Sequence, residues 1–251
     1  MSKGYLIYAV DEPYISRAQT LKKSIEHHTN DDVTIISDNF PYKKTEPLVW
    51  DGKVQPTNNL LDYWQIYWAT PYDETIVLDA DMLFLNDYSY WWNYLSKFDL
   101  LFPDTIINYK QETIKHEQYD KILTEHNIRP AYEKMFYFKK GDVALEFFNM
   151  LQVIISNFIK FSFDYYPSRR PKECIAKYFI PACIKSLGIG DIVYDKNNIF
   201  RYVDMKLSCL NAHVKKWDED LYYWGDMTNF YIENFNQYYP LHYRNANLSS
   251  T

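Results

Sequence analysis

The sequence contains few glycines and no glycine-rich phosphate-binding motif. Only 6 of its 251 residues are glycine, and neither GxGxxG nor GxxxxGK followed by Ser or Thr occurs. Those motifs need glycine because the backbone must approach a phosphate closely. Their absence argues against a dinucleotide-binding fingerprint and against a P-loop.

Cysteines and long apolar runs are also scarce. The three cysteines, Cys174, Cys183 and Cys209, are widely spaced and form no CxxC pair. An odd number of isolated cysteines is typical of free thiols in a reducing compartment. No run of about 18 apolar residues occurs, and the N-terminus shows no leader pattern. These features predict a cytoplasmic protein without integral membrane association.

Positive charge is in deficit, because 27 Lys and Arg face 33 Asp and Glu, which gives a formal net charge of −6 at pH 7. Proteins that bind a nucleic-acid backbone usually have a basic balance, so the overall charge argues against a general nucleic-acid binder. One local exception is the cluster of Arg169, Arg170 and Lys172 at the start of a predicted helix over residues 172–187. Both a phosphate contact and a solvated turn are consistent with this cluster.

The order of the apolar segments predicts an α/β fold. Short runs rich in β-formers over residues 5–10, 33–37 and 75–78 are typical of buried strands, and apolar spacing predicts a helix over residues 15–28. Strand, helix and strand at such close intervals indicate a right-handed βαβ unit and a parallel sheet. The further expectations are helices over 59–70, 88–95, 142–160 and 172–187, strands over 100–102 and 135–138, an apolar continuation over 82–85, a polar lid or insertion over 104–129, and an irregular tail from residue 204.

Two carboxylates follow the third predicted strand directly. Residues 75–85 read TIVLDADMLFL, so Asp79 and Asp81 interrupt an apolar run, where a charge is costly unless it is paired or bound to a cation. Ligands bind at the carboxyl ends of strands in an open α/β sheet, and alternation along an extended segment puts residues i and i+2 on one face. The pair therefore indicates one hard cation, Mg²⁺ or Mn²⁺. A helix cap with a structural ion pair is the alternative.

The same segment carries a family resemblance. Residues 71–81, PYDETIVLDAD, resemble the metal-binding block of GT-A-fold glycosyltransferases of the glycogenin-like kind. The opening strand and helix of that family resemble residues 8–25 here. Three later segments also resemble the family: residues 132–140 (YEKMFYFKK) its later hydrophobic strand, residues 171–173 (PKE) the start of a helix, and residues 241–244 (LHYR) a C-terminal metal-binding segment.

The resemblance implies a role for individual residues. The implied assignments are Tyr8, Ala9, Val10 and Tyr14 for the nucleobase, Asp79 and Arg244 for the donor diphosphate, Asp79, Asp81 and His242 for the metal, and Glu173 as the catalytic residue facing the sugar or acceptor. It also implies a UDP-sugar donor, a Mn²⁺ or Mg²⁺ cofactor, and transfer with retention of anomeric configuration.

The sequence departs from the family at two of these segments. Glu133 and Lys134 stand where the family usually has a pair of small residues, and His242 lacks the usual GxxKPW continuation. Trp91 and Trp92, shortly after the acidic pair, are consistent with either a sugar subsite or core packing. The donor phosphate contacts are therefore less constrained by the resemblance than the metal site.

We therefore expect a single GT-A-type, Rossmann-like domain over residues 1–251, with a mixed, mostly parallel sheet flanked by helices. Its nucleotide-sugar half is expected over residues 1–103 and its acceptor half with the tail over 104–251. The expected activity is metal-dependent transfer of a sugar from a nucleotide diphosphate to a hydroxyl of a saccharide, a protein or a modified DNA base.

Two alternatives stay open at this point. A nucleotidyltransferase also uses paired carboxylates and a metal, although residues 9–20 lack the glycine-rich or basic loop that it would need. A non-catalytic module on the same fold would bind glycans through its aromatic side chains, which make up 19% of the residues.

Overall fold

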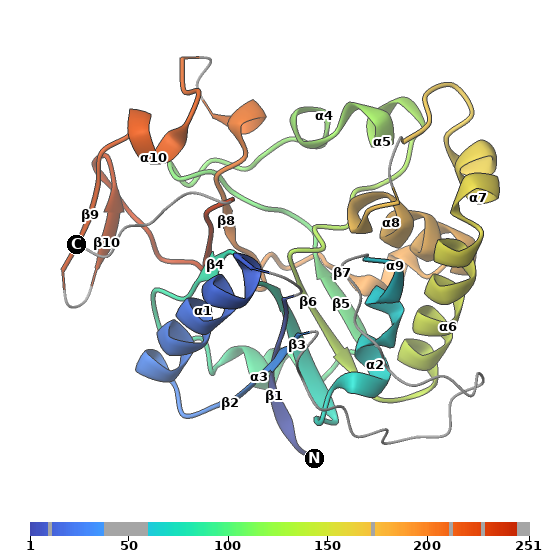
Figure 1. The fold of residues 1–251 in the computed structure, drawn as a ribbon, viewed down its shortest axis with the longest axis horizontal. Coiled ribbons are helices and arrows are strands. Elements are labelled where there is room, and N and C mark those ends of the chain that lie inside the picture. The colour runs from blue at the N-terminus through green and yellow to red at the C-terminus, as the bar shows by residue number, and fades with distance from the viewer. Residues whose placement is uncertain (10–11, 38–59, 172–173, 211–212, 227–228, 245–251) are drawn as a thin grey trace.

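The computed structural model (Figure 1) describes residues 1–9, 12–37, 60–171, 174–210, 213–226 and 229–244. Three residues with expected roles, Val10, Lys172 and Glu173, lie outside these described residues.

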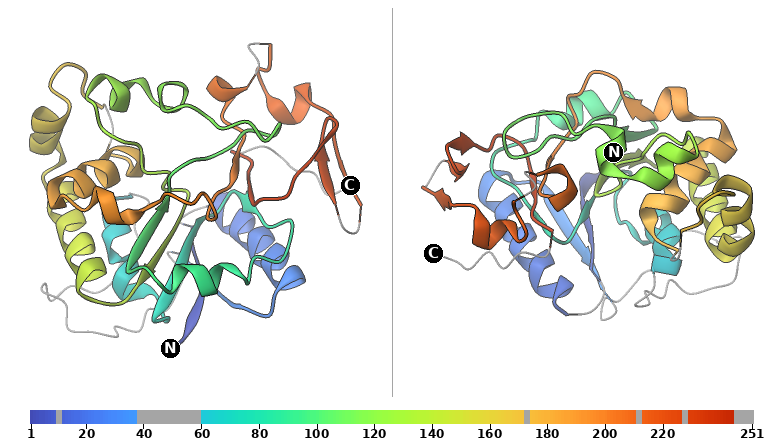
Figure 2. Two further views of the ribbon diagram at one scale, coloured as in Figure 1. Left: turned by 180° about the vertical axis from the view of Figure 1, so that it is seen from behind. Right: turned by 90° about the horizontal axis from the view of Figure 1, so that it is seen from above.

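A mixed six-stranded sheet forms the centre of the molecule (Figures 1 and 2). Its strands lie in the order β2-β1-β3-β6-β5-β7, and β6 runs antiparallel to both of its neighbours while the other pairs are parallel. The strands are β1 Lys3–Tyr8, β2 Asp32–Ile36, β3 Glu74–Asp79, β5 Leu100–Pro103, β6 Met135–Lys139 and β7 Tyr194–Asp195. The expected mixed, mostly parallel sheet is thus confirmed.

Alternate residues of the central strands supply two apolar cores, one on each face of the sheet. Leu6, Val77 and Phe136 pack on one face with helices α2, α6 and α8. Tyr5 and Ile76 pack on the other face with α1 and α3. These helices are α1 Tyr14–His28, α2 Ile66–Ala69, α3 Trp91–Leu95, α6 Asp142–Ser156 and α8 Ala176–Leu187. Because both faces are covered, the strands read as continuous apolar runs in the sequence.

The C-terminal segment is more regular than the tail that the sequence predicted, so that expectation is wrong. It contributes β8 Val203–Asp204 and β12 Leu241–His242, which form a second sheet with β4 Met82–Leu83 in the order β4-β12-β8. A third sheet, β11-β10-β9, projects from one side of the molecule (Figure 1). Its strands are β9 Tyr223–Gly225, β10 Phe230–Ile232 and β11 Phe235–Asn236, and η2 Leu207–Cys209 and α10 Trp217–Asp220 precede them. Strands of two or three residues are too short to produce a readable alternation.

Two helix expectations are corrected. The helix expected over residues 142–160 is broken into α6 and α7 Phe158–Tyr165, which meet at 97°. Asn157 lies at the break with φ −120° and donates its side-chain amide to the carbonyl of Val153, a local bond of the kind that competes with helix continuation. Helix α8 begins only at Ala176, so Arg169 and Arg170 do not stand at its start.

The remaining helices are short. The polar segment 104–129 contains α4 His116–Tyr119 and α5 Lys121–Glu125, η1 Leu60–Gln65 precedes α2, and α9 Gly190–Val193 precedes β7. Within the described part of the chain, no single helix is long and apolar enough to cross a membrane. Helices α6 and α7 meet that test of length and composition only when taken together across their bend.

Candidate active site at the carboxyl end of the sheet

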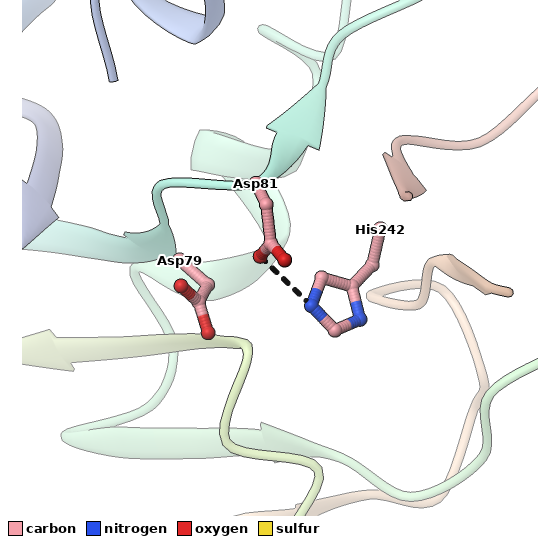
Figure 3. A group of neighbouring side chains, drawn as sticks. All are labelled: Asp79, Asp81 and His242. Carbon is pink, nitrogen blue, oxygen red and sulfur yellow. Dashed lines mark ion pairs between the residues drawn. The ribbon is translucent and has the colours of Figure 1, made fainter. Parts of the chain in front are cut away.

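Three possible metal ligands converge beyond the end of β3. One ligand atom each of Asp79, Asp81 and His242 lies within 4.8 Å of the other two (Figure 3). Asp81 and His242 are 5% and 1% exposed, and Asp79 is half-buried. Two carboxylate oxygens and one imidazole nitrogen at this spacing suit a divalent cation such as Mn²⁺ or Mg²⁺. The three residues therefore fit the metal that the sequence led us to expect.

A turn, rather than strand alternation, brings the two carboxylates together. Strand β3 ends at Asp79, Ala80 and Asp81 form a turn, and β4 begins at Met82. The amide of Ala80 donates to Asp79 Oδ1 over 2.8 Å and fixes that carboxylate. The expected proximity of Asp79 and Asp81 holds, but the reason for it is a tight turn at the sheet edge.

Strand β12 places His242 next to Asp79 and Asp81. His242 lies in register with Met82 of β4 on one side and with Asp204 of β8 on the other, and the amide of Tyr243 donates to the carbonyl of Asp81 over 3.0 Å. His242 Nε2 lies 2.9 Å from Asp81 Oδ1, and Nδ1 lies 3.4 Å from Asp204 Oδ1. A carboxylate behind a ligating histidine orients the ring and raises its basicity.

The buried charges around His242 balance one another. Burial alone would lower the pKa of His242, but the carboxylates of Asp81 and Asp204 outweigh it and raise the pKa to about 9. Burial alone would likewise raise the pKa of Asp204, but His242 and Arg244 hold it well below its usual range. Arg244 donates from both Nε and a terminal nitrogen to the same carboxylate. Asp204 therefore positions the expected metal ligand and the expected phosphate contact together.

Asp79 has a cationic partner of its own. Lys134, directly before β6, donates from Nζ to Asp79 Oδ2 over 2.5 Å, and the amide of Asp79 donates to the Lys134 carbonyl over 2.9 Å. Burial alone would lower the pKa of Lys134, but Asp79 and Glu133 outweigh it and raise that pKa. Without a bound metal, each ligand carboxylate is therefore neutralised by a protein cation.

A pocket of about 470 Å³ opens beside this cluster. Its lining is of three kinds: the aromatic residues Tyr8, Tyr14, Tyr63 and Tyr119, the acids Asp79 and Glu133, and the bases Lys134, Lys177, Lys206 and Arg244, with Leu78, Ile175 and Ala176 completing it. Four cations around one pocket are notable in a chain of net charge −6. Aromatic rings beside convergent cations suit a nucleobase joined to phosphates.

One of the four cations has no carboxylate to neutralise it among the contacts of the described residues. Lys134 pairs with Asp79, Lys177 with Asp120 over 2.7 Å, and Arg244 with Asp204. Lys206 donates instead to the backbone carbonyl of Tyr119. Burial, together with the neighbouring cations Arg244 and Lys177, lowers the pKa of Lys206. An anionic ligand in the pocket would relieve this repulsion.

Four of the residues expected to bind the donor, Tyr8, Tyr14, Asp79 and Arg244, line this pocket. Ala9, at the end of β1, is buried, with its amide donating to Ile36. Val10 and Glu173 lie outside the described residues.

Other candidates lie elsewhere. Trp91 and Trp92 are buried in the core at 0% and 3% exposure, which is the core-packing alternative of the two. The exposed Arg169 pairs with Glu125 over 3.2 Å, and Arg170 lies over the ring of Phe163.

Sequence reasoning missed several lining residues as site residues. Tyr63 and Lys206 come from segments without a motif, so nothing local marked them. Glu133 and Lys134 were seen only as a departure from the family pattern, although two charges directly before an apolar strand are a usable signal. Asp204 lay in the segment expected to be irregular.

No protein-family model and no curated protein sequence matches the chain. Similar folds occur among solved structures. A crystal structure of an active-site mutant of LgtC has a TM-score of 0.50 at 11% identity, over 96% of this chain and 88% of that chain. The galactosyltransferase LgtC in complex with donor and acceptor sugar analogues has a TM-score of 0.45 at 12% identity. This match covers 76% of this chain and 72% of that chain.

The apo form of the glycosyltransferase GlyE of Streptococcus pneumoniae TIGR4 has a TM-score of 0.42 at 11% identity, and the match covers 78% of this chain. The chain spans less than half the length of the first structures that it matches, with 46% of GlyE and 34% of the bifunctional WbbM covered. At these identities the likeness concerns the fold. The chain has the fold of LgtC, the GT-A fold of glycosyltransferases, with paired aspartates at the end of β3.

Proposed function

We propose that this chain is a metal-dependent glycosyltransferase that moves a sugar from a nucleotide diphosphate donor, with UDP as the nucleotide, to an acceptor hydroxyl. The acceptor is a saccharide, a protein or a modified DNA base. The observation that carries the proposal is the convergence of Asp79, Asp81 and His242 beside a pocket that Asp79 lines together with four cationic side chains and four tyrosines.

Different side chains of the pocket bind different parts of the donor in this proposal. Tyr8 and Tyr14, at the end of β1 and the start of α1, offer ring faces to the base. Lys206 and Arg244 offer positive charge to the phosphates, and Asp204 holds Arg244 in place by a two-point contact. Asp79, Asp81 and His242 would hold Mn²⁺ or Mg²⁺, which neutralises the charge that develops on the leaving diphosphate.

Both halves of the chain contribute to this one site, so we treat residues 1–251 as one catalytic unit. Tyr8 and Asp79 come from the first half, and Lys134, Lys206 and Arg244 come from the second. His242 in β12 lies beside Asp79 at the end of β3, so the proposed metal group also joins the two halves.

Calorimetric titration of UDP into the protein tests this proposal. UDP is titrated with Mn²⁺, with Mg²⁺ and with EDTA, and uridine is titrated as the control ligand without phosphates. We expect metal-dependent binding of UDP and much weaker binding of uridine, because the metal and the lysines act on the diphosphate.

The outcomes separate the competing functions. Binding of glycans without any binding of UDP would favour the non-catalytic module and overturn the proposal. Equal binding of UTP and UDP, with pyrophosphate released from UTP and a sugar phosphate, would favour a nucleotidyltransferase instead.

A further inference from the structure

We propose that Glu133 is the nucleophile of this site, and that its carboxylate attacks the anomeric carbon of the donor sugar. The inference rests on the proposed glycosyltransferase function and adds to it the residue that carries the sugar between donor and acceptor. It also commits the reaction to retention of anomeric configuration.

The sheet places Glu133 beside the metal group. Met135, the first residue of β6, is in register with Leu78 of β3, and the amide of Asp79 donates to the carbonyl of Lys134. Glu133 therefore stands one residue beyond the point where β6 meets Asp79. Lys134 Nζ is 2.5 Å from Asp79 Oδ2 and 4.0 Å from Glu133 Oε1, so one ammonium lies between the two carboxylates.

Glu133 is buried, and its carboxylate has a hydrogen bond from its own backbone but only long contacts to other side chains. Its side chain is 4% exposed and lines the pocket. Within the described part of the chain, its side-chain partners are long: Tyr119 Oη at 3.5 Å and Lys134 Nζ at 4.0 Å. A buried carboxylate is costly unless it is well paired, and burial raises the pKa of Glu133 despite the neighbouring Lys134 and Arg244 and the backbone hydrogen bond. The arrangement is more typical of a group that acts on a ligand than of a structural ion pair.

The pocket offers no other described acid for the sugar. Of the described residues that line it, only Asp79 and Glu133 carry carboxylates, and Asp79 belongs to the metal group. A sugar joined to a diphosphate that is held at Asp79 would lie in the same pocket, and Glu133 lines that pocket and shares the Lys134 ammonium with Asp79. In retaining glycosidases, a carboxylate beside the anomeric carbon is the nucleophile that forms the covalent sugar intermediate.

The proposed transfer consists of two successive substitutions at the anomeric carbon of the sugar. In the first, a Glu133 oxygen forms a bond to the anomeric carbon while the bond from that carbon to the diphosphate oxygen breaks, and the electron pair leaves with the nucleotide diphosphate. In the second, the acceptor oxygen bonds to the same carbon, the electron pair of the broken ester returns to Glu133, and the acceptor proton passes to a phosphate oxygen of the departing nucleotide. Two inversions give net retention.

Chemical rescue with azide tests the assignment. A panel of UDP-hexoses first identifies a donor from which the wild type releases UDP. Release is then measured for Glu133→Ala, Glu133→Gln and the control Glu146→Ala, which removes an exposed acid from α6, with and without sodium azide. Titration with UDP and Mn²⁺ checks that each variant keeps the donor site.

We expect both Glu133 variants to bind UDP like the wild type and to lose at least about 100-fold in UDP release. Azide should restore release in Glu133→Ala, where it fits the vacated space, and should yield a glycosyl azide of inverted configuration. Glu133→Gln should not respond, because its amide fills that space, and Glu146→Ala should match the wild type.

Two results would overturn the assignment while leaving the proposed function intact. One is UDP release by Glu133→Ala within about threefold of the wild type, a change of less than 1 kcal/mol. The other is loss of release without any glycosyl azide. A wild type that binds UDP and metal but releases UDP from no donor would instead remove the proposed function, and this inference with it.

Discussion

Metal binding at this site should displace a proton from His242. The imidazole can ligate a metal only when it is neutral, whereas Asp81 and Asp204 raise its pKa to about 9. At pH 7, two units below that value, only about 1% of the imidazole is neutral. The apparent affinity at pH 7 should therefore be about 100-fold below its plateau and should rise about tenfold per pH unit up to about pH 9.

Calorimetry of Mn²⁺ and Mg²⁺ binding checks this expectation. Titrations at pH 6.5, 7.5 and 8.5, in buffers of different ionisation enthalpy, report the number of protons released. We expect about one proton per ion at pH 7.5, where His242 is still protonated in the metal-free protein.

Two variants assign the proton to His242. In Asp204→Asn, loss of one neighbouring charge should lower the pKa of His242 and move the transition to lower pH. In His242→Ala, the pH dependence over this range should disappear together with most of the affinity. Affinity that is constant from pH 6.5 to 8.5, with no proton released, would refute the reasoning.

Three further predictions follow from the same structure. Because the fold raises the pKa of His242 to about 9, its protonation should add about 3 kcal/mol to the free energy of unfolding of the metal-free protein. This contribution is fully present below pH 6.5 and is lost as the pH rises through about 9. In denaturant titrations between these pH values, the free energy of unfolding should fall with pH in the wild type, and His242→Ala should lack this fall. Lys206→Met should weaken UDP binding about tenfold and leave uridine binding unchanged, because we propose that this pocket-lining charge contacts the phosphates. Equal losses for both ligands would contradict this placement. Phe136→Ala should lower the free energy of unfolding by about 3–5 kcal/mol, since the ring is fully buried and stacks on Phe102 at 5.1 Å; a denaturation midpoint close to that of the wild type would count against the packing.

The sequence predicts the features that a few neighbouring residues determine. The apolar runs that became β1 and β3 are buried on both faces, so their composition alone marked them as strands. Asp79 and Asp81 were recognisable because charges in such a run require a cation. The two acids among the possible metal ligands were therefore predictable, and the resemblance at residues 241–244 pointed to His242, which the structure places beside them.

Long-range pairing determines what the sequence did not predict. His242 and Asp204 meet because β12 lies between β4 and β8, and strands of two residues leave no pattern. Lys206 reaches the pocket across the fold, and Glu133 becomes a site residue only because β6 pairs with β3. The break at Asn157 was likewise hidden by the apolar residues on either side of it.

UDP release is the most direct test of the central claim that Asp79, Asp81 and His242 form the metal centre of a glycosyltransferase. It is measured across a UDP-sugar panel, with water as the acceptor, for the wild type, for Asp81→Asn and for Asp191→Asn, which makes the same change at a fully exposed position. We predict release by the wild type that requires Mn²⁺ or Mg²⁺ and stops with EDTA, the same rate in Asp191→Asn, and at least about a 100-fold loss in a folded Asp81→Asn. A folded Asp81→Asn protein that releases UDP at the wild-type rate, or wild-type release that EDTA does not change, would contradict the claim.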